Sequence, residues 1–124
     1  MKEENIIKQK SFDFAVQVVN LYKSLVGQHH EYVLSKQLLK SGTSVGANVC
    51  EAIFAQSRKD FVSKMNIALK ESYETEYWLE LLYRTGYMDE RQYLNIVANC
   101  RELTNILVAI VKTSKVETSD FPAE

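Results

Sequence analysis

The chain has 124 residues, of which 46% are hydrophobic and 25% charged, and its formal net charge is −1. These values are typical of one soluble domain, large enough to bury a core without help from a disulfide or a metal. One proline and four glycines supply too few chain breaks for a sandwich or a barrel of many short strands. The near-neutral balance excludes a global charge that would draw the chain to nucleic acid or anionic lipid.

The chain start and the cysteine usage indicate a cytoplasmic protein with no membrane partner. The opening MKEENIIKQK lacks the apolar stretch of a secretory signal. The longest apolar runs, such as residues 106–111, are far shorter than the ~20 residues of a membrane span. Two cysteines without Cys-x-x-Cys spacing are too few for a secreted disulfide framework.

The first predicted helix covers residues 11–26, after a flexible segment at residues 1–10. Its polar positions recur every three or four residues, and nearly all the others are apolar: the polar ones are Asp13, Gln17, Asn20 and Ser24. A helix that packs on one neighbour needs an apolar stripe of only ~100°. We therefore expect this helix to meet a second partner surface.

The second predicted helix covers residues 31–56, after a turn at residues 27–30. The run Ser41-Gly42-Thr43-Ser44 is made of weak helix formers, yet the apolar stripe from Leu34 to Ile53 keeps its phase across it. We predict one continuous helix with a slender waist of small residues, where another helix approaches closely. A kink, or two shorter helices, is the alternative.

Ser57 and Asp89 are suitable N-caps for a third and a fourth helix, and Gly86 closes the third. From residue 113 the chain turns polar and loses its period, so residues 113–124 are expected to form a flexible tail. Turns of two to four residues force successive helices to lie antiparallel. The prediction is an all-α, up-down-up-down four-helix bundle over residues 11–112.

No pattern in the sequence predicts a metal, a cofactor or a catalytic site. Di-iron bundles need Glu-x-x-His pairs, whereas the only histidines, His29 and His30, share a turn. Cys50 and Cys100 are expected to be buried free thiols inside helices. Phosphate loops, nucleophile elbows and zinc spacings are absent from the sequence. We therefore expect a protein that is not an enzyme.

A polar stripe follows the second helix at Ser44, Asn48 and Glu51. Asparagine is unfavourable in a helix interior, because its side chain competes with the backbone. The stripe is either an exposed face or a polar network across a helix or subunit interface. The turns place Glu51 level with Asn66, and Glu74 level with Arg101.

Six aromatic side chains are concentrated on the third and fourth helices, more than one slim bundle can bury: Tyr73, Tyr77, Trp78, Tyr83, Tyr87 and Tyr93. Tyrosine and tryptophan are favoured at interfaces, where one end packs and the other stays wet. Together with the apolar first helix, they predict a homo-oligomer.

The predicted topology brings the starts of the first and third helices and the ends of the second and fourth to one pole. This pole gathers the candidate nucleic-acid-binding residues, which are all basic: Lys8, Lys10, Arg58, Lys59, Lys64, Lys112 and Lys115. A chain with net charge −1 can thus present a basic end, and local field is what attracts phosphate. The alternative is that these lysines are scattered for solubility.

The runs SGTSVGANVCEAIFAQSRKDF and KMNIALKESYETEYWLELL resemble the bacterial four-helix-bundle proteins that are encoded in intervening sequences of large-subunit ribosomal RNA genes. The chain is also similar to the accessory protein of diversity-generating retroelements, a basic pentamer that works with a reverse transcriptase and nucleic acid. The resemblance covers residues 11–112 and implies a ring-like homopentamer. This chain is slightly acidic, unlike the basic members.

Two classes of function remain after this reading. The first is a non-enzymatic oligomeric module that binds RNA, DNA or a nucleic-acid enzyme through the basic pole. The second is a protein-interaction scaffold with no nucleic-acid role.

Overall fold

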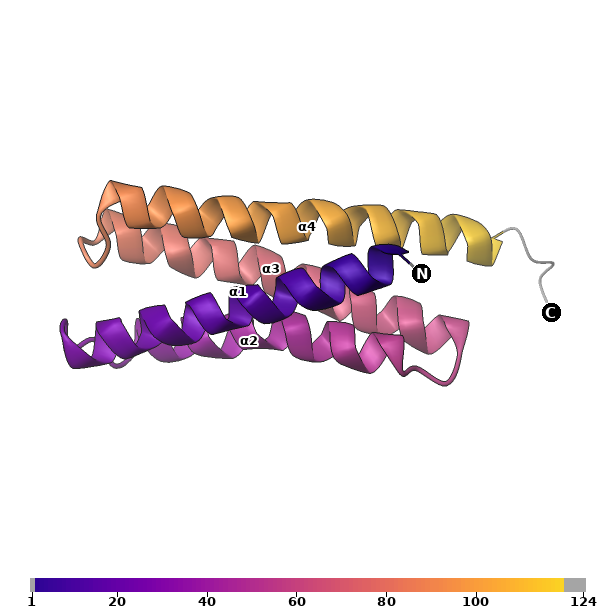
Figure 1. Ribbon diagram of the computed structural model, residues 1–124, viewed down its shortest axis with the longest axis horizontal. Coiled ribbons are helices and arrows are strands. Elements are labelled where there is room, and N and C mark those ends of the chain that lie inside the picture. The colour runs from indigo at the N-terminus through magenta and orange to yellow at the C-terminus, as the bar shows by residue number, and fades with distance from the viewer. Residues whose placement is uncertain (1, 120–124) are drawn as a thin grey trace.

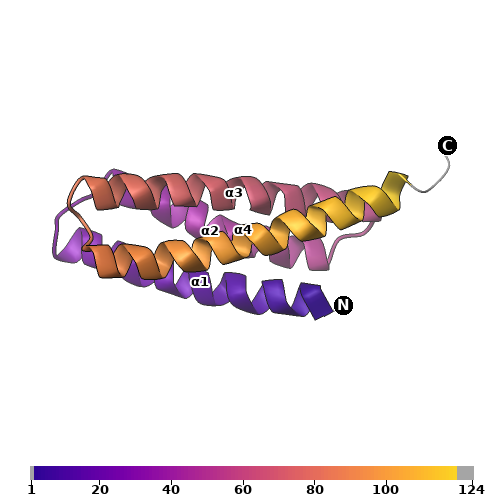
Figure 2. The same ribbon diagram turned by 90° about the horizontal axis from the view of Figure 1, so that it is seen from above.

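The computed structural model describes residues 2–119, which form four helices and no strand (Figures 1 and 2). They are α1 (Lys2–Gly27), α2 (Leu34–Ile53), α3 (Arg58–Arg84) and α4 (Glu90–Ser119). Successive helices run antiparallel, so the start of α1, the α2–α3 turn and the end of α4 lie at one end of the molecule (Figure 1). The predicted all-α four-helix bundle is confirmed.

Both terminal helices are longer than the sequence predicted. α1 begins at Lys2 rather than near residue 11, and α4 continues to Ser119 through residues expected to be a flexible tail. Ile7 is fully buried, and Val111 and Ser114 are nearly so. These buried side chains pack against the bundle and stabilise the added turns of each helix, although most of the residues around them are polar. Residues 1 and 120–124, which the predicted flexible ends include, lie outside the described residues.

The second helix is continuous through its small residues, as predicted, and is not divided into two shorter helices. A Cβ added to Gly42 would lie 2.8 Å from both methyl carbons of Val18 on α1. A Cβ added to Gly46 would lie 3.2 Å from the Ser11 carbonyl oxygen. These two glycines let α1 and α2 approach closely at the waist.

The helix starts are fixed by side-chain caps. Ser57 Oγ accepts the backbone N–H of Asp60 at 3.0 Å, as the sequence predicted. Asp89 and Gln92 form a reciprocal capping box on α4: Asp89 Oδ1 accepts the Gln92 N–H at 2.8 Å, and Gln92 Oε1 accepts the Asp89 N–H at 3.2 Å. Gly86 has φ +91°, which glycine adopts without strain.

The start of α2 differs from the prediction, because Glu31 caps this helix instead of opening it. Its Oε1 accepts the backbone N–H groups of Val33 and Leu34 at 3.1 and 2.8 Å, and its Oε2 accepts that of Ser35 at 2.6 Å. The side chain is buried, and burial raises the pKa of a carboxyl group. The three backbone hydrogen bonds outweigh burial and hold the pKa of Glu31 below its ordinary value.

Helix α4 is the most apolar of the four in its middle. The stretch Glu90–Lys115 is long and apolar enough to cross a membrane by length and composition, which the sequence analysis did not expect. The same stretch supplies core side chains such as Leu103 and Leu107. Its central charges pair across the bundle, Arg101 with Glu76 on α3 and Glu102 with Lys10 on α1. Packing between α1 and α3 therefore accounts for its apolar face.

Candidate interaction surfaces

An apolar groove with a volume of about 640 Å³ runs between α1 and α2 on the outside of the bundle. Phe12 forms part of its wall and is 67% exposed. Its α2 side is lined by small residues: Thr43, Gly46, Ala47 and Cys50. Phe54 just beyond α2 is 72% exposed, and Lys8, which also lines the groove, lies with its Nζ 5.9 Å from the Phe54 ring centroid. We call this surface the α1–α2 groove.

The predicted polar stripe on α2 makes one local and one inter-helix contact. Asn48 Nδ2 donates to the Ser44 carbonyl oxygen, one turn back in the same helix, at 2.8 Å. Glu51 Oε1 lies 3.8 Å from Lys64 Nζ on α3, a contact of opposite charges rather than a short hydrogen bond. Asn48 therefore has a partner inside its own helix, and a bond across a subunit interface stays a prediction.

The polar network that links the helices lies elsewhere, in the core. Thr75 Oγ1 on α3 donates to Ser41 Oγ on α2 at 3.0 Å, and Thr104 Oγ1 on α4 donates to Ser72 Oγ on α3 at 2.9 Å. Cys100 Sγ lies 3.4 Å from the Ser72 carbonyl oxygen. All five side chains are buried. The sequence analysis expected Cys100 to be buried but missed this network. The signal was that hydroxyl residues stand in phase with the apolar stripe of each helix.

Side-chain amides and an ion pair link α1 to α4 at the surface of the bundle. Asn99 Nδ2 donates to Gln17 Oε1 at 3.0 Å, and Gln17 Nε2 donates to Asn95 Oδ1 at 2.8 Å. Farther along, Lys10 Nζ pairs with Glu102 Oε1 at 3.0 Å. This side of the bundle is therefore the polar one, in contrast to the α1–α2 groove.

The aromatic residues divide into exposed and packed groups. Tyr73 and Tyr77 on α3 are more than half exposed, and Tyr77 contacts the Trp78 ring edge-on at 5.0 Å between centroids. Tyr83 and Tyr93 stack between α3 and α4, with ring centroids 4.3 Å apart and planes within 5°. The bundle thus buries Tyr93 and leaves two tyrosines of α3 for contact with something outside it.

Arg101 pairs with Glu76 at 3.2 Å, two residues along α3 from Glu74, with which the sequence placed it level. Thr104 on α4 and Ser72 on α3 are in contact beside this ion pair, so the helices meet within one turn of the predicted register.

Four of the seven basic candidates have partners at their end of the bundle. Lys10 and Lys64 are in the ion pairs described above. Lys8 lies against Phe54, and the Arg58 guanidinium lies 5.2 Å from the Phe61 ring centroid.

The other three, Lys59, Lys112 and Lys115, are exposed and form no ion pair with the side chains that the structure describes, those of residues 2 and 4–115. Lys8 and Arg58 are exposed as well and keep their positive charge beside the aromatic rings. We call Lys59, Lys112 and Lys115 the basic end.

The two thiols differ, and the prediction that both are buried is wrong for one of them. Cys50 is exposed in the α1–α2 groove, whereas Cys100 is fully buried. Burial, with a smaller contribution from the Glu76 carboxylate, raises the pKa of the Cys100 thiol to about 12. Both histidines are exposed in the α1–α2 turn, and residues 2–119 contain no group of three His, Cys, Asp or Glu side chains placed to hold a metal.

Comparison with known proteins places the chain in a family. The sequence profile described as "23S rRNA-intervening sequence protein" matches residues 3–109. The crystal structure of a protein of unknown function from the S23 ribosomal protein family of Bacteroides thetaiotaomicron is similar, with 55% identity and a TM-score of 0.87. The match covers 89% of this chain and 98% of that one. No protein with a curated description matches this chain. Since the profile spans most of the sequence, the chain belongs to the 23S rRNA-intervening sequence protein family.

Proposed function

We propose that this protein is a non-enzymatic module that assembles into a homo-oligomer through the α1–α2 groove. The observation that carries the proposal is the exposure of Phe12 and Phe54 beside the small residues of the groove. Exposed aromatic side chains rimmed by polar residues mark association surfaces on soluble proteins. The cytoplasm is the compartment that we expect.

A ring-like pentamer is the assembly that we favour, on the resemblance to known pentameric bundles. A five-fold ring needs a heterologous interface, in which the groove of one subunit meets a different face of the next. Tyr73 and Tyr77 supply an exposed aromatic face on α3, and such side chains suit the wet edge of an interface.

Replacing Phe12 with Glu tests the assembly. Because Phe12 is largely exposed in the single chain, the variant should fold with unchanged helix content by circular dichroism. Light scattering at micromolar concentration should give the parent about five times the 14.3 kDa chain mass and the variant a much lower mass. Tyr32→Glu, at a half-exposed turn residue outside the groove, is the matched control and should keep the parent mass. A parent mass near one chain would refute the proposal.

We further propose that the basic end binds the phosphate backbone of nucleic acid. Lys59, Lys112 and Lys115 support this, since they are exposed and carry no ion pair among the described side chains of residues 2 and 4–115. A ring would repeat the three charges in every subunit, and it is the local field, not the net charge of −1, that attracts phosphate. Recognition of this kind is independent of sequence.

The test compares two charge-reversed pairs at opposite ends of the bundle. Lys59→Glu with Lys112→Glu should abolish retention of structured RNA and of duplex DNA at low salt. Lys23→Glu with Lys36→Glu, at the far end, makes the same change in net charge and should leave retention unchanged. The parent should show log K falling with log salt at a slope of about −0.9 for each phosphate contacted in DNA. A parent that retains neither nucleic acid would leave the protein-interaction scaffold as the function.

A further inference from the structure

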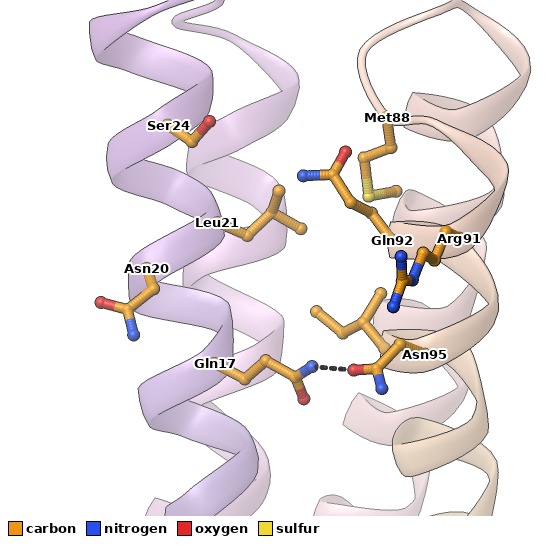
Figure 3. A pocket seen from close by; sticks show the side chains of 9 residues that line it. Gln17, Asn20, Leu21, Ser24, Met88, Arg91, Gln92 and Asn95 are labelled. Atoms are coloured by element: carbon orange, nitrogen blue, oxygen red, sulfur yellow. Dashed lines mark hydrogen bonds between the residues drawn. The ribbon is translucent and has the colours of Figure 1, made fainter.

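A second pocket, with a volume of about 450 Å³, opens between α1 and α4 near the α3–α4 turn (Figure 3). It lies on the polar side of the bundle, away from the α1–α2 groove. Its floor is apolar, made by Met88 and Ile96, which are buried, and by Leu21, which is partly buried. Gln17, Gln92, Asn95 and Arg91 line its polar side.

The side-chain oxygens of Gln17, Gln92 and Asn95 each accept one hydrogen bond from the protein. Gln17 Oε1 accepts from Asn99, and Asn95 Oδ1 accepts from Gln17. Gln92 Oε1 accepts the backbone N–H of Asp89 in the α4 capping box. The α4 wall has N–H donors without a hydrogen bond to the described residues: Gln92 Nε2, which points toward α1 in Figure 3, Asn95 Nδ2 and the guanidinium of Arg91. Asn20 also lines the pocket, and its amide is turned away from α4 in Figure 3.

The pocket also carries a net positive charge. No carboxylate lines it, and Arg91 forms no ion pair with any residue of the described part of the chain. Arg84 and Arg101, by contrast, pair with Glu80 and Glu76. In Figure 3 the Arg91 guanidinium lies between Gln92 and Asn95 along α4, so the spare donors are on the same wall as the unpaired charge.

We infer that this pocket binds a carboxylate that is attached to a short apolar chain. The carboxylate accepts from Arg91 and the spare amide N–H groups, because a guanidinium and a carboxylate match in geometry and charge. The apolar chain lies on Leu21, Met88 and Ile96, in a cavity within the size range of small-molecule sites. This inference goes beyond the proposed function and does not depend on it.

Titration of the full-length protein with hexanoate, followed by amide nitrogen–proton NMR, tests the site. We expect saturable shifts at residues lining the pocket. Hexanamide has the same chain without the charge, and phosphate has charge without the chain; each should bind at least tenfold more weakly. Arg91→Gln should weaken hexanoate binding at least tenfold. Arg84→Gln, which removes an equal charge from an arginine outside the pocket, should leave it within twofold.

The outcomes separate the inference from its competitors. Equal binding of hexanamide or of phosphate, or an equal loss in Arg84→Gln, would overturn it, as would the absence of saturable shifts. N-acetylleucine carries the same carboxylate next to a peptide unit. If N-acetylleucine binds more tightly than hexanoate, the natural ligand is the C-terminus of a polypeptide. If it binds more weakly, the natural ligand is a free carboxylic acid. Either order supports a carboxylate site, provided that Arg91→Gln weakens the binding of both acids at least tenfold.

Discussion

Glu31 connects the α1–α2 turn to the first turn of α2 through three backbone hydrogen bonds to its carboxylate. We predict that Glu31→Gln destabilises the fold by about 1 kcal/mol at pH 7, the usual effect of losing a helix cap. The amide keeps one acceptor oxygen and places an NH₂ group where Ser35 needs the second. Chemical denaturation measures the change, and Glu90→Gln, at an exposed acid in the first turn of α4, is the control.

The difference between Glu31→Gln and the parent should depend on pH. Because the folded-state pKa of Glu31 is lowered from 4.5, its contribution to the free energy of unfolding is present above the unfolded-state pKa. It is lost as the pH falls through the folded-state value. The two proteins should therefore converge in stability as the pH falls below the folded-state pKa of Glu31. A difference that stays constant from pH 7 down to the acid limit of the folded state would mean that the ionised carboxylate is not the stabilising group.

At the scale of the helix, two helices pack closely where Gly42 of α2 meets Val18 of α1. A Cβ at position 42 would lie 2.8 Å from two carbons of the buried Val18. We predict that Gly42→Ala destabilises the fold by about 1–2 kcal/mol, since overpacking outweighs the gain of about 1 kcal/mol in helix propensity.

Two further variants control the prediction for Gly42. Gly27→Ala, at a position with open space around it, should be neutral or stabilising in the same denaturation experiment. Combining Gly42→Ala with Val18→Ala should cost less than the sum of the two single changes, because the smaller side chain makes room for the new methyl group. If Gly42→Ala stabilises the protein as Gly27→Ala does, the waist is not a tight contact.

The sequence predicted this waist, because the apolar stripe of the second helix keeps its helical spacing through residues of low helix propensity. The same signal failed at the helix ends, where inward residues such as Ile7 and Ser114 stand among charges. It also failed to predict that the hydroxyl residues Thr75 and Thr104 are buried. Burial of a hydroxyl depends on a hydrogen-bond partner on a neighbouring helix, and the sequence does not show that partner. The sequence indicated the groove only as surplus apolar surface on α1. It could not show that α2 forms the other wall, because this depends on how the helices pack.

At the scale of the whole molecule, the two cysteines report on assembly. Cys50 is exposed in the groove through which we propose that subunits associate, whereas Cys100 is buried with its thiol pKa raised to about 12. Since the thiolate is the reactive form, only Cys50 should react with a thiol reagent at pH 8 while the protein is folded. In the assembled parent the neighbouring subunit should slow even that reaction.

We therefore predict that Phe12→Glu, which is designed to break the assembly, reacts at Cys50 at least tenfold faster than the parent. Tyr32→Glu should react at the parent rate. Dilution of the parent toward its dissociation constant should raise the rate to that of Phe12→Glu, because both treatments uncover the same groove. Stopped-flow absorbance gives these rates, and Cys50→Ser should remove the fast phase. Equal rates in an assembled parent and in a dissociated variant would place the subunit interface on another face of the bundle.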